Sequence, residues 1–252
     1  MRPIYDPKWA VEAIAISADR SYLALGLDER VKIFCLKDEL EDNIADDDFH
    51  VELKMDGMVR VVAFCPKSEW LAVGGENNTA SIFTNWNVWT NSMSQLADSQ
   101  KPLDLVREPA FQYLDGDEEV WAIAFSPNRD RLAVGGEDKR LSCFALTAKY
   151  EEKNKNSGFM WEISRSADLL VCAFSPESTR IAAGGEDNCV GIIDAATGIC
   201  LHTVKFPYKV TELFFSFDSM RLFVGGESKK ASIFDVHNGE KLHGKRCMVI
   251  PE

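Results

Sequence analysis

The sequence has few positive charges for its length. Its 252 residues contain 28 Lys and Arg against 40 Asp and Glu, which gives a formal net charge of −12. A chain this acidic repels phosphate backbones and anionic lipid headgroups, because binding to either requires clustered Lys and Arg. We therefore expect neither nucleic acid nor a membrane surface among its partners.

Long apolar runs are also missing. No stretch of about 18 residues is apolar enough to predict a transmembrane helix. Pro3, Asp6, Pro7 and Glu12 interrupt the region where a secretory signal would need a continuous apolar segment. The seven cysteines are an odd number and include no Cys-x-x-Cys pair, which is typical of thiols that are kept reduced. These features predict a soluble cytoplasmic protein, with a nuclear location left open.

Catalytic and metal-binding patterns are equally scarce. The chain has four histidines, and no Gly-x-Ser-x-Gly or His-Glu-x-x-His motif accompanies them. The sequence thus shows no nucleophile beside a base, and no set of ligands with the spacing of a closed metal site. We expect no catalytic residue, no metal site and no cofactor.

One pattern is present in five copies. Each copy has an apolar run, a turn, a second apolar run that ends near a glycine, and a third apolar run. The copies read IAISADRSYLALGLDERVKIF, VAFCPKSEWLAVGGENNTASIF, IAFSPNRDRLAVGGEDKRLSCF, CAFSPESTRIAAGGEDNCVGII and LFFSFDSMRLFVGGESKKASIF. Their glycines, Gly26, Gly75, Gly136, Gly185 and Gly226, are 49, 61, 49 and 41 residues apart. A unit of about 40 residues that recurs in this way indicates a repeat architecture.

Within each copy the apolar residues alternate with period two, as at Val120 and Ala122, which predicts short strands. A turn that proline favours joins the first strand to the second in three copies, at Pro66, Pro127 and Pro176. A tight Gly-Glu-Asp turn then leads to the third strand, and a fourth strand completes the unit. One such sheet cannot bury both faces alone, so we expect an all-β fold whose four-stranded antiparallel sheets stack as the blades of a β-propeller.

This pattern, clearest in FSPNRDRLAVGGEDKRLSCF, resembles the WD40-repeat family of β-propellers. The resemblance covers essentially the whole chain. The tryptophan that names the family is replaced by Phe34, Phe83, Phe144, Ile193 and Phe234. The family's turn aspartate is present as Asp28, Asp138 and Asp187, and is replaced by Asn77 and Ser228.

The family's histidine before the first strand is also missing. By spacing, its positions hold Lys8, Asp56, Asp117, Ser166 and Pro207. The family's hydrogen-bond relay from this histidine to the turn aspartate is therefore not expected. Cohesion within the blades should rest on apolar packing and on local turn bonds.

We predict a single domain over residues 1–252. Three of the repeats are longer than the unit of about 40 residues. We expect their additional residues to form enlarged loops at about 36–48, 84–108 and 147–157, each after a third strand. Five repeats leave three arrangements open: a closed five-blade ring, an incomplete propeller that a partner or a second copy completes, and a truncated product. In an incomplete propeller, open blade edges would invite self-association or pairing with a partner.

The resemblance implies a binding face. In this family the residue before the turn aspartate lies on the narrow top face, where partner peptides dock. That residue is Glu76, Glu137, Glu186 or Glu227 in four copies and Leu27 in the first. Four carboxylates would favour peptides that are basic or of mixed charge. Further candidates for partner contact are Trp121 on an innermost strand, and Trp86 and Trp89 in the second enlarged loop.

Two functions follow from this arrangement. The favoured one is a non-catalytic protein-interaction scaffold that binds partner proteins through the top face and through the long loops between third and fourth strands. The alternative is a propeller-fold enzyme, or a cation-binding propeller that uses the ring of glutamates, because carboxylates can collect an ion such as Ca²⁺.

The first enlarged loop gives a direct test of its predicted character. Residues 38–48 contain seven carboxylates in eleven positions, and like charges in a block repel one another and extend the chain. Deleting these residues is expected to leave the melting temperature nearly unchanged, because a solvated loop contributes little packing. Circular dichroism measures the melting temperature of both proteins. A large fall on deletion would show that the segment is part of the core.

Overall fold

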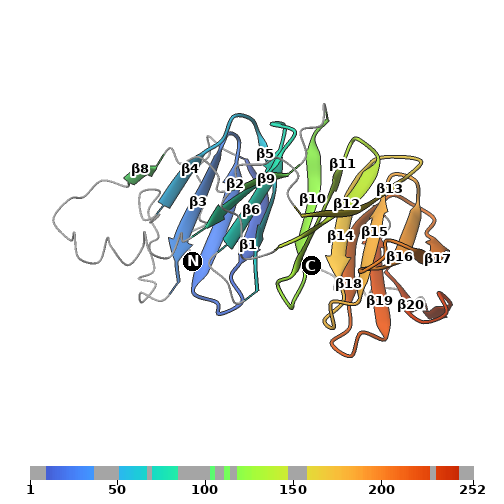
Figure 1. The fold of residues 1–252 in the computed structure, drawn as a ribbon. Helices are drawn as coiled ribbons and strands as arrows, with labels where there is room; N and C mark the ends of the chain where they lie inside the picture. The colour runs from blue at the N-terminus through green and yellow to red at the C-terminus, as the bar shows by residue number, and fades with distance from the viewer. Residues whose placement is uncertain are drawn as a thin grey trace, which may run out of the picture. The chain divides into compact units, whose positions relative to one another are not determined.

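The computed structural model describes residues 10–36, 51–66, 70–84, 103–105, 111–113, 118–146, 158–227 and 231–243. All regular secondary structure in these ranges is β-strand, and the strands form five sheets (Figure 1). None of the described residues belongs to a helix that is long and apolar enough to span a membrane. The all-β fold predicted from the alternating apolar pattern is confirmed.

The chain divides into two compact units. Unit 1 comprises residues 1–120 with 151–156, and unit 2 comprises residues 121–150 with 157–252. We name the five sheets blades 1 to 5 in chain order. Blades 1 and 2 belong to unit 1, and blades 3, 4 and 5 belong to unit 2.

Unit 1 contains two blades. Blade 1 consists of β1 (Val11–Ile16), β2 (Tyr22–Leu27), β3 (Arg30–Cys35) and β4 (Val51–Lys54), with β8 (Leu103–Leu105) beside β4. Blade 2 consists of β5 (Val59–Phe64), β6 (Trp70–Gly75), β7 (Ala80–Thr84) and β9 (Phe111–Tyr113). Strand β8 pairs with β4 in parallel and comes from a segment where the sequence predicts only a loop. Three residues are too few for an alternating pattern to be recognised.

Unit 2 contains three blades of four strands. Blade 3 consists of β10 (Val120–Phe125), β11 (Arg131–Gly136), β12 (Arg140–Ala145) and β13 (Phe159–Ser164). Blade 4 consists of β14 (Leu169–Phe174), β15 (Arg180–Gly185), β16 (Cys189–Asp194) and β17 (Cys200–Lys205). Blade 5 consists of β18 (Val210–Phe215), β19 (Arg221–Gly226), β20 (Ser232–Asp235) and β21 (Lys241–His243). Neighbouring strands in blades 4 and 5 are antiparallel, as predicted.

The turn between the first and second strands has the predicted form. In blade 3 the amide of Arg129 donates to the carbonyl of Ser126 at 2.9 Å, and in blade 4 the amide of Ser178 donates to the carbonyl of Ser175 at 2.8 Å. The residue after Ser126 is Pro127, whose fixed φ suits this position of the turn. Arg129 and Ser178 close the turns with φ of 66° and 62°, which returns the chain to the second strand.

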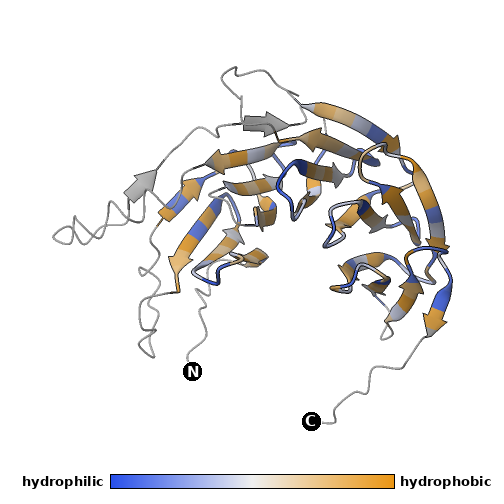
Figure 2. Ribbon diagram, turned by 60° about the horizontal axis from the view of Figure 1, so that its bottom comes forward, coloured by the Kyte–Doolittle hydropathy of each residue, from blue (hydrophilic) through white to orange (hydrophobic). Residues whose placement is uncertain are grey.

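The blades of unit 2 bury their apolar faces against one another, and hydrophobic residues make up much of their strands (Figure 2). Cys143 of blade 3 and Ile181 of blade 4 belong to one buried cluster, while Ala182 of blade 4 and Leu222 of blade 5 belong to the next. A fully buried Leu or Ile side chain contributes about 1.5 to 3 kcal/mol relative to an exposed one. Sheet-to-sheet burial is therefore the main source of cohesion within unit 2.

Cysteine reactivity should follow burial. Cys143 and Cys172 lie in the cluster between blades 3 and 4, and burial raises the pKa of both thiols to about 12. In native protein at neutral pH we expect an alkylating reagent to label the exposed Cys200 and to reach Cys143 and Cys172 only after unfolding, because the thiolate is the reactive form. Peptide mass mapping with and without urea measures this. Equal labelling of all three cysteines in native protein would contradict it.

Candidate functional site

The turns between second and third strands carry the glutamates that the sequence singles out. Glu76 follows β6, Glu137 follows β11, Glu186 follows β15 and Glu227 follows β19. Glu76, Glu186 and Glu227 are exposed, and Glu137 is half-buried. The end of the three blades of unit 2 that carries these turns is called the turn face below, and it presents Glu137, Glu186 and Glu227.

A close approach of two backbones positions the glutamates. The amide of Glu186 donates to the carbonyl of Asp168 at 3.0 Å, and a Cβ added to Gly185 would lie only 1.9 Å from that same oxygen. The same arrangement recurs at Gly226, where the carbonyl of Lys209 is 1.9 Å from the added Cβ. Only glycine fits at these two positions. In blades 4 and 5 the last glycine of the repeat therefore fixes where the glutamate leaves the second strand.

The next residue of the turn stabilises it through its own side chain. The carboxylate of Asp138 accepts the amide of Arg140 at 3.0 Å, that of Asp187 accepts the amide of Cys189 at 3.1 Å, and the side-chain oxygen of Asn77 accepts the amide of Thr79 at 3.4 Å. These are the local bonds by which Asp and Asn favour tight turns. Asp28 takes the equivalent place in blade 1 with a φ of 34°, and Ser228 lies outside the described residues.

In unit 2 a lysine lies among the acidic groups of the turn face. Lys209 Nζ is 2.8 Å from Glu186 Oε1. The hydrogen bond to Glu186 is the largest cause of a raised pKa at Lys209, and the charges of Glu186, Glu227 and Asp168 raise the pKa further. The ammonium group thus interacts with three carboxylates, and the local charge remains negative.

In unit 1 an arginine forms ion pairs with a turn glutamate and with two other glutamates. Arg60 Nη2 is 3.0 Å from Glu76 Oε1, its Nε is 3.2 Å from Glu119 Oε2, and its Nη1 is 3.7 Å from Glu12 Oε2. The sequence predicts the glutamate at position 76 but gives no indication of the cation beside it, because Arg60 is 16 residues away in the chain. The turn glutamates Glu76 and Glu186 are therefore each paired with a cation on or beside an innermost strand.

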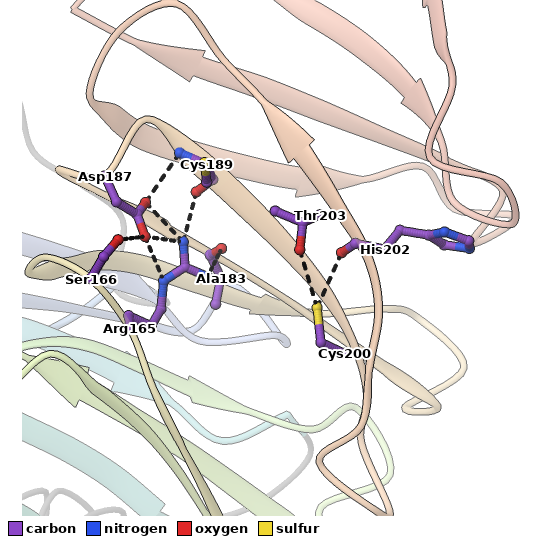
Figure 3. A network of polar contacts seen from close by, with 8 residues as sticks. All are labelled: Arg165, Ser166, Ala183, Asp187, Cys189, Cys200, His202 and Thr203. Atoms are coloured by element: carbon purple, nitrogen blue, oxygen red, sulfur yellow. Dashed lines mark hydrogen bonds and ion pairs between the residues drawn. The ribbon is translucent and has the colours of Figure 1, made fainter.

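Arg165 and Asp187 form a largely buried ion pair at the turn of blade 4. Arg165 Nη2 donates to both carboxylate oxygens of Asp187 at 2.9 and 2.8 Å, and Nε donates at 3.1 Å (Figure 3). Both side chains are 10% exposed. Nη2 also donates to the carbonyl of Cys189 at 2.9 Å, and Nη1 donates to that of Ala183 at 3.3 Å. The turn of blade 4 is thereby tied to the segment that enters the blade.

In blade 4 the turn aspartate is bound by an arginine, although the family's histidine is missing. Ser166, at the histidine position, contributes one bond of 3.4 Å to Asp187, while its neighbour Arg165 makes the main contacts. The prediction that local turn bonds and apolar packing alone hold the blades is incomplete at blade 4. A signal was present in the sequence: Gly191 stands where other third strands have Ser or Lys, and a Cβ there would lie 3.1 Å from Arg165 Nη1. Glycine within a strand often marks such a close approach.

The remaining candidates are spread over the chain. Trp121 is half-buried near the start of β10. Trp86, Trp89 and the acidic segment 38–48 lie outside the described residues. Within the described part of the chain, no group of three or more His, Cys, Asp or Glu side chains is arranged to hold a metal ion.

Comparison with known proteins identifies the repeats. The family model of the WD domain, G-beta repeat (WD40), matches residues 51–84, 110–144 and 164–194. The first match runs from β4 to β7, so it contains the outer strand of blade 1 and the first three strands of blade 2. The other two begin in the same way, with the end of one blade and the start of the next. A search of curated proteins finds no match.

Breaking the buried pair should destabilise the protein. Arg165→Met leaves the carboxylate of Asp187 buried without its main partner, and we expect a loss of about 3 kcal/mol in the free energy of unfolding. Urea denaturation measures the loss. The matched control is Arg140→Met, because the pair of Arg140 with Glu162 has an arginine that is 53% exposed, and its removal should cost about 1 kcal/mol or less.

A double substitution separates charge burial from packing. Arg165→Met combined with Asp187→Asn should recover part of the loss, because the neutral amide leaves no buried charge uncompensated and its oxygen can still accept the amide of Cys189. If Arg165→Met cost no more than Arg140→Met, the pair would not be a structural element of blade 4.

Proposed function

Because the chain carries repeats of the WD40 family, we propose that it is a non-catalytic scaffold that binds other proteins. WD40 repeats in general mediate contacts between proteins, and this chain supplies the blades for such a surface. Fold alone does not assign a partner, so the proposal rests on the chemistry of the turn face. The cytoplasm is the proposed location, which the six free cysteines among the described residues support.

We propose further that the turn face of unit 2 recognises a lysine or arginine side chain in the partner. The observation that carries this proposal is Lys209, whose ammonium group is 2.8 Å from Glu186 and also interacts with Glu227 and Asp168. The position of the protein's own Lys209 supports a basic side chain as the group that these carboxylates bind. With three acidic groups around one cation, the site retains negative charge for a second basic group.

The internal pair is weak enough to be exchanged. Side-chain exposure is 34% for Lys209 and 40% for Glu186, and exposed pairs of this kind contribute about 0.2 to 1 kcal/mol. A basic residue of a partner can therefore displace Lys209 at little cost. Most of the affinity would have to come from apolar anchors elsewhere in the contact, while the carboxylates steer the partner and select its charge.

Charge reversal tests the proposal. The probe is a fluorescently labelled lysine-rich peptide, and a glutamate-rich peptide of the same length is the control. Binding of each peptide is measured by fluorescence anisotropy at low and at high salt. The wild-type protein should bind the basic peptide, and the affinity should fall with salt. The double variant with Glu137→Lys and Glu186→Lys should lose about tenfold or more in affinity, with an unchanged melting temperature.

The matched control lies at the other end of blade 4. Glu177 is exposed in the turn between β14 and β15, so Glu177→Lys changes the net charge by the same amount per residue but leaves the turn face intact. It should weaken binding only slightly. Equal losses in the control and in the turn-face variant would mean that net charge, and not this site, attracts the peptide.

A further inference from the structure

The turn between the third and fourth strands has the same construction in blades 4 and 5. In blade 4 the amide of Gly198 donates to the carbonyl of Asp194 at 2.9 Å, and in blade 5 the amide of Gly239 donates to the carbonyl of Asp235 at 3.0 Å. The two glycines have positive φ values of 74° and 72°, which glycine adopts without strain. The two turns differ in the residue that precedes the glycine.

This residue is Thr197 in blade 4 and Asn238 in blade 5. An asparagine before a glycine can react with its own backbone, because glycine has no side chain to hinder the approach. The amide nitrogen of Gly239 attacks Cγ of Asn238, the new bond between them forms, and the bond from Cγ to Nδ2 breaks. The side-chain amino group leaves as ammonia with the proton of the backbone nitrogen. Water then opens the cyclic imide at either carbonyl and gives aspartate or isoaspartate.

The closed turn restrains both reacting groups. The attacking amide of Gly239 is engaged by the carbonyl of Asp235. Asn238 Oδ1 accepts the amide of Glu240 at 2.9 Å, and Asn238 Nδ2 donates to Glu240 Oε2 at 3.3 Å. The carboxylate of Asp235 also accepts the backbone amide of Asn238 at 3.2 Å. The reaction therefore has to wait for a local opening of the turn.

Blade 4 holds this turn of blade 5 closed. His202 Nε2, on β17, donates to the carbonyl of His237 at 2.6 Å. A Cβ added to Gly239 would lie 3.2 Å from His202 Cβ, so the turn lies directly against the strand. Arg180 Nη1 adds a bond of 2.9 Å to the carbonyl of Val236. Opening of the turn has to break the bond from His202.

The contact from His202 has an equivalent between blades 3 and 4. Trp161 Nε1 donates to the carbonyl of Ala195 at 3.1 Å, and a Cβ added to Gly198 would lie 2.7 Å from Trp161 Cδ2. Trp161 and His202 are both the third residue of their outer strands. In both junctions a ring on the outer strand of one blade therefore covers the glycine turn of the next blade, but only the turn of blade 5 contains an asparagine.

We propose that Asn238 is a site of spontaneous deamidation, and that its rate is set by how often the turn opens away from His202. The isoaspartate product inserts an additional methylene group into the backbone before Gly239. This insertion lengthens the turn and displaces the groups that Asp235 and His202 bind. Conversion thus weakens the contact of the outer turn of blade 5 with blade 4, and the modified fraction increases with the age of the protein.

Prolonged incubation of the full chain at neutral pH tests the proposal, with peptide mass mapping to follow the conversion. In the wild-type protein Asn238 should convert faster than Asn128 and Asn188, which also lie in turns between strands but are not followed by glycine. His202→Ala should accelerate the conversion of Asn238 about fivefold, which is the effect of one lost hydrogen bond on an opening equilibrium. Equal rates at the three asparagines, or equal rates in the wild type and in His202→Ala, would overturn the proposal.

Two control variants separate the bond from a general loosening of blade 5. His202→Gln keeps a side-chain donor and should convert more slowly than His202→Ala. Leu201→Ala removes the neighbouring apolar side chain, which is 40% exposed, and should convert at the wild-type rate. If Leu201→Ala accelerated the conversion as much as His202→Ala, the bond from His202 would not set the rate and the proposal would be wrong.

The effect of the modification on stability has its own control. Asn238→Thr introduces the residue of blade 4, which cannot form the cyclic imide. After incubation, the wild-type protein should melt at a lower temperature in proportion to its isoaspartate content, which peptide mapping measures. The Asn238→Thr variant should keep its initial melting temperature. An equal fall in both proteins would contradict the proposed effect on blade 5.

Discussion

The architecture depends on one constraint: a four-stranded sheet with apolar residues on both faces must be covered on both. In unit 2, blade 4 meets this requirement with small residues such as Ala182 toward blade 5, and with Ile181 toward blade 3. Alternation along each strand directs successive residues to the two neighbours. The repeats therefore specify individual strands and at the same time the contacts by which the blades hold one another.

The strands and turns could be predicted because each is repeated. An alternating run and a glycine turn that recur together leave few alternatives, and the family match falls on the three copies that also have the proline turn. The carbonyl oxygen beside Gly185 shows why the glycine recurs. Features that occur once escaped prediction for the opposite reason. Arg165 is such a feature, since its equivalents in the other four repeats are Pro7, Met55, Gly116 and Phe206, and a single departure carries no pattern.

The candidate site was predictable in part. The sequence places a glutamate in four turns, and the structure shows three of them exposed. What the sequence does not reveal is the set of cations beside them, because Lys209 and Arg60 reach the turns from 23 and 16 residues away. The turn face is therefore less negative than a count of glutamates suggests. Its selectivity depends on how easily these internal cations are exchanged, which is a property of side-chain exposure and not of net charge.

Strand β8 has a consequence for how the chain acquires its structure during synthesis. The outer edge of β4 pairs with residues 103–105, which follow the first three strands of blade 2 in the chain. Since proteins emerge from the ribosome in order and fold as their segments become available, blade 1 has an unpaired edge until blade 2 is largely made. The parallel pairing then closes that edge with a segment from the connection inside the next blade. Blade 1 thus reaches its final form only with the help of its successor, and the two blades of unit 1 mature as one folding unit.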